Sequence, residues 1–295
     1  MPFYVGYASS VPRVSVWEVR EDRIFKIHET PEVGKAIPDG LNGEQFLREL
    51  FPKLTIEKYN LAGKFFPRMT RPTIGFEGGH WNYPGYEASQ LDIASSMIQL
   101  EALYSHLLDI CRVVHPQQEN VGAFGHEIRN LLILASTEFE AQCKGVLNAN
   151  EARPNSNRRD FNIIDYQAVA EVMRLEEYGA ALTAFPWWGE IRPFDAWKTD
   201  RCLKWYQDYN AVKHDREREF KRATLGAVIS AVAACAIILD AQYGDSRNRF
   251  VPAMAQAFSL RRPDWPAAER YAPTVVLDGK GSYLLQPMGV TRYEF

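Results

Sequence analysis

The sequence lacks the cysteine pairs that mark a disulfide framework or a zinc site. Its cysteines are scattered, and none of them forms a CxxC pair: Cys111, Cys143, Cys202 and Cys235. Buried, reduced thiols in a cytoplasmic protein are therefore expected, because disulfide scaffolds and zinc sites use closely spaced cysteines. The N-terminus also lacks the basic start and apolar core of a signal peptide.

An excess of charge of one sign is missing as well. The 295 residues carry a formal net charge of -3, which is close to neutral for a chain of this size. The net charge therefore gives no global electrostatic argument for a nucleic-acid or membrane partner. The length and the ordinary composition instead predict a globular protein of one or two domains.

Common catalytic signatures are absent from the sequence. It contains no GxxxxGK[ST], no GxGxxG and no GxSxG. His126 and Glu127 begin like the HExxH motif of zinc proteases, but Asn130 stands where the second histidine must be. Without two imidazoles on adjacent helical turns, a zinc protease is excluded. No metal and no cofactor are expected.

The most distinctive stretch runs from Trp205 to Tyr243. An aromatic and charged segment leads into Ala223–Leu239, which contains neither charge nor proline. Small residues recur there every three to four positions, which predicts a helix with one thin face. A membrane span needs about 20 strongly apolar residues. The run is shorter and rich in alanine, so the sequence favours the central helix of a soluble bundle over a membrane span.

Helical periodicity recurs through the middle of the chain. It predicts helices over 90–115, 122–148, 165–179 with Asp165 as the cap, and a fourth region from 205 to 243. Short β patterns flank them, with hairpins near 14–28 and 275–285 and a short helix at 42–51. The expected fold is mainly α, a four- to five-helix bundle at 89–245 between β-containing segments 1–88 and 246–295. The two ends are hypothesised to pair in one sheet.

One polar cluster has the chemistry of a catalytic site. Asn210 and His214 are one helical turn apart, and Lys213 and Arg216 lie beside them. Cleavage of RNA by its own 2′-hydroxyl requires a group that moves protons near neutral pH, which histidine provides. It also requires fixed positive charge, which lysine or arginine provides. A solvated helix end is the alternative interpretation of the same residues. The neighbouring aromatics, Trp205, Tyr206 and Tyr209, are candidates for stacking on bases.

The segment YNAVKHDR, followed by phenylalanine and a small-residue apolar helix, resembles the last helix of HEPN-domain proteins. These are helical, often dimeric proteins of antiphage defence, toxin–antitoxin pairs and RNA processing. Their motif is arginine, a polar residue, three further residues and histidine. Asn210 and His214 match it, whereas Tyr209 occupies the arginine position. The resemblance covers about 89–245 and implies a metal-independent ribonuclease and a homodimer, with Arg216 or Lys213 replacing the missing arginine.

Other residues complete this hypothesis. Arg129, Asn130 and Glu138, on the predicted helix 122–148, are candidates to orient His214 or bind RNA, and Glu127 and Glu140 of the same helix are further candidates to orient His214. A second interpretation is an inactive helical module that binds RNA or a partner protein, which Tyr209 in the arginine position favours. A third places a small-molecule site at His80 and Trp81, in an aromatic loop rich in glycine.

Overall fold

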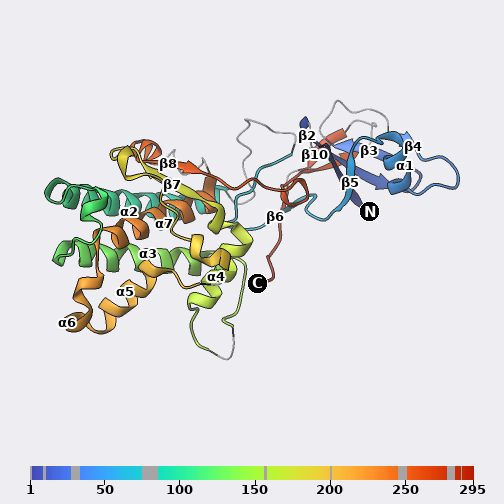
Figure 1. The fold of residues 1–295 in the computed structure, drawn as a ribbon. Coiled ribbons are helices and arrows are strands. Elements are labelled where there is room, and N and C mark those ends of the chain that lie inside the picture. The colour runs from blue at the N-terminus through green and yellow to red at the C-terminus, as the bar shows by residue number, and fades with distance from the viewer. Residues whose placement is uncertain are drawn as a thin grey trace. The chain divides into compact units, whose positions relative to one another are not determined.

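The structure is a computed structural model, and it describes residues 2–8, 11–27, 34–74, 86–155, 158–199, 201–244, 251–277, 283–286 and 288–295. These residues form two compact units, whose elements are labelled in Figure 1. The first unit comprises Met1–Phe66, Arg71–Tyr86 and Asp264–Thr291. The second comprises Pro67–Thr70, Glu87–Pro263 and Arg292–Phe295. His80 and Trp81 lie outside the described residues.

The first unit is built on a five-stranded antiparallel sheet in the order β4-β3-β2-β1-β5. Its strands and the short helix before the last of them are β1 (Phe3–Ala8), β2 (Val11–Arg20), β3 (Arg23–Ile27), β4 (Lys35–Ala36), α1 (Gly43–Leu50) and β5 (Thr55–Tyr59). The predicted hairpin near 14–28 is confirmed as β2–β3, and the predicted short helix is confirmed as α1. Asn42 starts α1 with a capping box that it forms with Gln45.

Both faces of this sheet are covered, because successive side chains of a strand point to opposite faces. On one face Trp17, Val19 and Ile56 form a core with Leu47 of α1. On the other face Val5, Val16, Ile27 and Tyr59 pack against residues that include Ala267 and Ala272. The sheet therefore has two small cores, and the C-terminal part of the chain completes one of them.

The C-terminal segment joins the first unit without extending its large sheet. β9 (Thr274–Leu277) pairs with β10 (Tyr283–Gln286), which confirms the predicted C-terminal hairpin. β11 (Gly289–Val290) pairs in parallel with β6 (Lys64–Phe65). Within the described residues, the strands of the first 30 positions pair only with one another, with β4 and with β5. The two ends therefore share a unit but lie in different sheets, and the one-sheet hypothesis is wrong.

The second unit is helical with a small two-stranded sheet. Its longer helices are α2 (Tyr86–Val113), α3 (His126–Ala149), α4 (Ile163–Met173), α5 (Lys204–His214) and α7 (Leu225–Tyr243). The four-residue helix α6 (Arg216–Glu219) and the 3₁₀ turn η5 (Phe220–Arg222) connect α5 to α7. β7 (Gly179–Leu182) pairs with β8 (Phe258–Arg261). Further 3₁₀ turns are η1 (Gln118–Asn120), η2 (Leu175–Glu177), η3 (Pro186–Trp188), η4 (Asp195–Thr199) and η7 (Pro252–Gln256).

Helix α7 lies at the centre of this unit, as the central-helix interpretation predicts. Nearly all of its residues are buried, and it packs against α3 and α5. By length and composition α7 is apolar enough to cross a membrane, but 89% of its most apolar window is buried inside the protein. Its one buried charge, Asp240, accepts two hydrogen bonds of 2.8 Å from the guanidinium of Arg262. The helix is therefore accommodated by protein on all sides.

The prediction of a mainly α fold is wrong. The described residues contain seven α-helices, but also a five-stranded antiparallel sheet with its own core, so the fold is a mixture of α and β. β1 and β5 were not predicted as strands, and they pair with each other across some 50 residues, as in the pair Phe3–Tyr59. Tertiary pairing of this kind outweighs local pattern, because strand preference depends on the neighbours that a strand finds.

Two helix boundaries also differ from the predictions. Asn162, and not Asp165, caps α4, while Asp165 occupies the third helical position and closes the capping box. Helix α4 ends early because Arg174 adopts a left-handed conformation with φ 55°. The predicted fourth helical region from 205 to 243 consists of α5, α6, η5 and α7.

A buried polar network joins α2, α3 and α7 to the segment Pro67–Thr70. The guanidinium of Arg68 donates to the side-chain oxygens of Gln242 at 2.6 Å and Gln142 at 2.8 Å. Gln142 in turn donates to Ser96 and Glu138. Gly145 makes room for this guanidinium, because a Cβ there would lie 2.1 Å from Nη1 of Arg68. The network holds Pro67–Thr70 as a part of the helical unit.

Gly145→Ala should lower the free energy of unfolding by about 1–3 kcal/mol, because the new methyl group displaces a guanidinium held by two hydrogen bonds. Alanine inside a helix would otherwise stabilise it by roughly 0.5–1 kcal/mol. In an Arg68→Ala background the same substitution should therefore be neutral or stabilising. Urea denaturation of the four proteins measures this, and an equal loss in both backgrounds would contradict the proposed contact.

Candidate functional site

The candidate catalytic residues lie around the end of helix α5. Asn210, Lys213 and His214 all belong to α5, as predicted, and His214 is its last residue. The helix ends because Asp215 adopts φ −136° and ψ 80°, and its side chain instead accepts a hydrogen bond from the backbone N–H of Arg218. Arg216 therefore begins the separate helix α6. The expectation that Arg216 shares a helical face with Tyr209 and Lys213, next to the face of Asn210 and His214, is therefore wrong.

Tyr209, at the position of the motif arginine, is buried and contacts another residue of its own helix, α5. It is 0% exposed, and its hydroxyl accepts a 2.7 Å hydrogen bond from Nζ of Lys213. The same Nζ lies 4.9 Å from the centre of the tyrosine ring. The hydrogen bond from Lys213 to Tyr209 raises the pKa of Lys213 above its usual value. Lys213 is thus a fixed positive charge beside His214, whereas Tyr209 does not reach solvent.

The aromatic side chains of α5 form a core and do not offer a stacking platform. Trp205 is 4% exposed and donates from Nε1 to the carbonyl of Pro193. Tyr206 is 8% exposed and donates a 2.7 Å hydrogen bond to Glu140 of α3. Burial is the main cause that raises the pKa of Tyr206, and this hydrogen bond adds to it. The expectation that these rings stack on bases is therefore wrong.

A buried carboxylate ties the end of this region back to α5. Asp208 has a 3% exposed side chain, and it accepts hydrogen bonds from Lys204 at 2.7 Å and from Arg222 of η5 at 2.8 Å. The bond to Asp208 raises the pKa of Arg222. The side chain of Arg222 thus stabilises the fold by joining η5 to α5. The more exposed cations of the region are Arg216, Arg218 and Lys221.

The predicted residues of α3 are not all directed toward α5. Nη1 of Arg129 donates to Oδ1 of Asn130 at 3.3 Å, near the start of α3. Glu138 accepts from Gln142, in the network that includes Ser96 of α2. The carboxylate that meets α5 is Glu140, through Tyr206. Among the described residues no side chain hydrogen-bonds to His214, so the structure shows no group that orients its ring.

Tertiary packing places beside η5 residues that local sequence patterns do not single out. The ring of Phe220 lies 4.9 Å from His126 and 6.0 Å from Phe124, measured between ring centres. The segment before α3 is fixed there by backbone hydrogen bonds from Leu225 to Ala123 and from Gly226 to Val121. His126 is exposed, and Phe124 is 47% exposed. The sequence signal was only a glycine-flanked Phe and His ahead of a helix.

These groups form one surface region of the helical unit, which we call the basic corner. It comprises Lys213, His214, Arg216, Arg218 and Lys221 together with Phe124, His126 and Phe220. Three acidic residues lie among these cations: Asp215 caps α6 and pairs with Arg218 at 3.9 Å, Glu219 pairs with Arg222 at 3.3 Å, and Glu217 is exposed. The corner therefore combines cations, two imidazoles and aromatic surface, which suits phosphate and base contacts.

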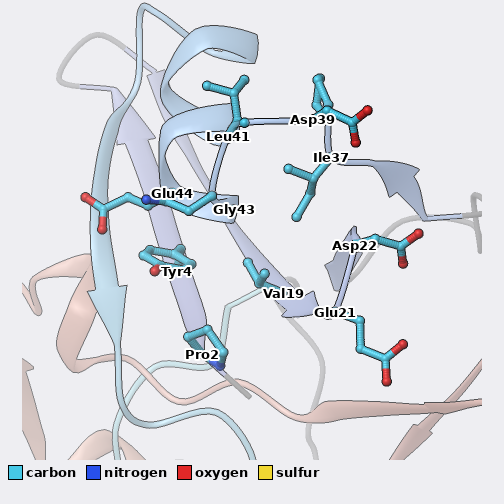
Figure 2. A pocket seen from close by; sticks show the side chains of 13 residues that line it. Pro2, Tyr4, Val19, Glu21, Asp22, Ile37, Asp39, Leu41, Gly43 and Glu44 are labelled. Carbon is cyan, nitrogen blue, oxygen red and sulfur yellow. The ribbon is translucent and has the colours of Figure 1, made fainter.

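A hollow of about 700 Å³ lies in the first unit and has the opposite charge. It is bordered by the carboxylates of Glu21, Asp22, Asp39 and Glu44, and none of its lining residues is basic. Figure 2 shows Glu21, Asp22 and Asp39 on one side of it, Glu44 on the other, and Val19 between them. No group of three metal-binding side chains occurs in the described parts of the chain. The hollow is therefore unsuited to phosphate.

No protein-family model, curated protein or solved structure matches the chain. The resemblance of residues 209–216 to the HEPN motif thus stays a prediction based on the residues themselves.

Asp208→Asn should lower the free energy of unfolding by about 1–3 kcal/mol, because it leaves Arg222 and Lys204 without their buried ionic partner. Arg222→Ala should cost a similar amount, and the double variant less than the sum of the two. Chemical denaturation measures this coupling. Asp195→Asn removes an exposed carboxylate that pairs with Lys198, so as a control it should change stability by less than about 0.5 kcal/mol. Simple additivity of the two changes would show that the pair does not hold η5 to α5.

Proposed function

We propose that the helical unit binds single-stranded RNA at the basic corner. The observation that carries this proposal is the exposure of Lys213, His214, Arg216, Arg218 and Lys221 along one short stretch of chain. From 213 to 222 the chain has five lysines and arginines against three acidic residues, which leaves a local charge of +2. A protein with an overall charge of -3 thus concentrates positive charge at this place.

The aromatic side chains of the basic corner favour binding of single-stranded RNA over double-stranded RNA. Phe124 exposes 47% of its surface next to Phe220 and His126. Stacking of an unpaired base on such a ring contributes about 1–3 kcal/mol and tolerates any base. A duplex keeps its bases stacked inside, so it would use only the cations. The proposal therefore includes a preference for single strands.

Removing three exposed cations should test where RNA binds. The variant Arg216→Ala/Arg218→Ala/Lys221→Ala should weaken binding of a fluorescent 20-nucleotide RNA at least tenfold in 50 mM salt. The slope of log affinity against log salt should also fall by about 2, since roughly 0.7 counterions are released per phosphate contact on single strands. Fluorescence anisotropy of the full chain measures both quantities.

The matched control removes the same charge elsewhere. Arg153, Arg158 and Arg159 are exposed in the polar loop before α4, and all three change to alanine in the control variant. This control should bind RNA as the unmodified chain does. Equal weakening by the two triple variants would show that binding follows net charge alone, and absence of binding by the unmodified chain would contradict the proposal.

A second candidate function is metal-independent RNA cleavage, which the exposed imidazole of His214 favours. Asn210 lies one turn before it on α5, and Lys213 holds its positive charge beside it. In this reaction the 2′-hydroxyl attacks phosphorus and the 5′-oxygen leaves, so one proton is removed and one is supplied. His214 would move protons, while Lys213 and Arg216 would stabilise charge on the phosphorane. The HEPN resemblance supports this activity and a setting in antiphage defence or toxin–antitoxin pairs.

Cleavage in EDTA separates the two functions. The unmodified chain should convert RNA to fragments with 2′,3′-cyclic phosphate ends, and His214→Ala should reduce that rate at least a hundredfold. His214→Ala should still bind RNA within about threefold, because it leaves the exposed lysine and arginine residues of the corner in place. Equal cleavage by both proteins would remove His214 from the reaction, and absence of cleavage by the unmodified chain would leave RNA binding as the function.

A further inference from the structure

The hollow of the first unit has an apolar floor. Its volume of about 700 Å³ lies within the range of small-molecule sites, about 300–1,000 Å³. The buried Val19 lines this floor together with the half-buried side chains of Tyr4, Ile37 and Leu41. Tyr4 and Ile37 pack against the core that contains Val19, so that core holds the floor in place. Small-molecule sites typically combine such an apolar lining with a few polar groups that orient the ligand.

The rim of the hollow carries negative charge that the protein does not neutralise. Glu21, Asp22 and Asp39 are exposed on one side (Figure 2), and within the described residues no ion pair or hydrogen bond engages their carboxylates. Glu44 lies on the other side (Figure 2). Arg48 donates two hydrogen bonds to Glu44, and both end on Oε1, which leaves Oε2 available. A cationic ligand would therefore relieve the repulsion among these charges.

The placement of the carboxylates does not suit a single metal ion. A metal ion needs several oxygens that approach it within about 2.0–2.6 Å. In the described parts of the chain, no three acidic, histidine or cysteine side chains converge to hold one. The carboxylates instead border an apolar floor from two sides. A ligand that meets both sides needs separate positive charges joined by an apolar chain.

We infer that the hollow binds a linear aliphatic polyamine, the chemical class of spermidine. One ammonium group lies among the carboxylates of Glu21, Asp22 and Asp39, and the methylene groups cross the apolar floor. A second ammonium group meets Glu44 and the ring of Tyr4, because an aromatic face attracts a cation. The hydroxyl of Tyr4 has no hydrogen-bond partner among the described residues, so it is able to accept a bond from that group.

The electrostatics of Tyr4 agree with this placement. Burial is the main cause that raises the pKa of Tyr4, and the charge of Glu44 adds to it, whereas Arg48 opposes it. The negative charge of Glu44 thus acts at the tyrosine hydroxyl, on the same side of the hollow. A cation bound there interacts with both groups.

The size of the hollow favours a small molecule over a basic segment of a partner protein. A stable protein interface uses about 20–30 residues on each side. The hollow is lined by 13 residues, all of them in the first 44 positions of the chain. They belong to the first unit, whereas the basic corner belongs to the second, so polyamine binding does not depend on RNA binding.

Titration calorimetry of the full chain, without RNA, tests the inference. Spermidine should bind with one molecule per chain. Butylamine has only one ammonium group and reaches one side of the hollow, so it should bind at least about tenfold more weakly. Mg²⁺ should displace spermidine no better than sodium chloride of equal ionic strength does. Absence of spermidine binding, equal binding of butylamine, or specific displacement by Mg²⁺ would overturn the inference.

A charge-removing variant tests the place of binding. Glu21→Gln/Asp22→Asn/Asp39→Asn should weaken spermidine binding about tenfold or more, since each exposed ion pair contributes a factor of about two to five. All three side chains are exposed, so the circular dichroism of the variant should match that of the unmodified chain. Unchanged affinity in this variant would contradict the proposed site.

The matched control removes the same charge at exposed positions outside the hollow. Glu49→Gln/Glu119→Gln/Glu171→Gln should bind spermidine as the unmodified chain does. Equal weakening by both triple variants would show that spermidine responds only to net charge, which refutes a site in the hollow. A lysine-rich peptide that binds more tightly than spermidine would replace the polyamine with a partner protein and also refute the inference.

Discussion

The burial of α7 on every side is the constraint on which the helical unit depends. Its 19 residues offer no polar face, so the neighbouring elements must cover it completely. Helices α3 and α5 pack directly against it, and Arg262 neutralises Asp240 near its end. The segment Pro67–Thr70 covers its last turn, where the backbone N–H of Thr70 donates to the carbonyl of Ala241. An unpaired charge or an uncovered apolar face would be costly here.

This constraint also decides which residues of the candidate site reach solvent. Because α5 must present Trp205, Tyr209 and Val212 to the core, Lys213 and His214 are turned outward. Tyr209 therefore cannot replace an arginine at the surface, and its hydroxyl instead binds Lys213. Positive charge at the site comes from the residues after the break at Asp215. The break gives α6 and η5 a new direction and brings Phe220 to His126.

Local pattern predicted the helices well and the sheet poorly. The positions of α2, α3 and α7 follow from periodic apolar residues, which act within one element and can be recognised without knowing its partners. The strands β1 and β5 are stabilised by pairing across the chain, and residues Ala267 and Ala272 complete the core beneath them. No local signal in residues 1–87 predicts that residues of the C-terminal segment complete the core of this sheet. The chain therefore folds as a mixture of α and β, although the part that is most easily predicted from the sequence is helical.

The sequence by itself determined the buried central helix, the cation-rich segment after Asn210 and the absence of metal and nucleotide motifs, because these are properties of adjacent residues. Only the tertiary structure decided that Tyr209 is buried, that Glu140 and not Glu138 meets α5, and that Phe124 and His126 lie beside Phe220. It also revealed that Leu91 and Ile98 of α2 are exposed. The physical reason is that spacing along a helix fixes which residues share a face, whereas packing decides which face is covered.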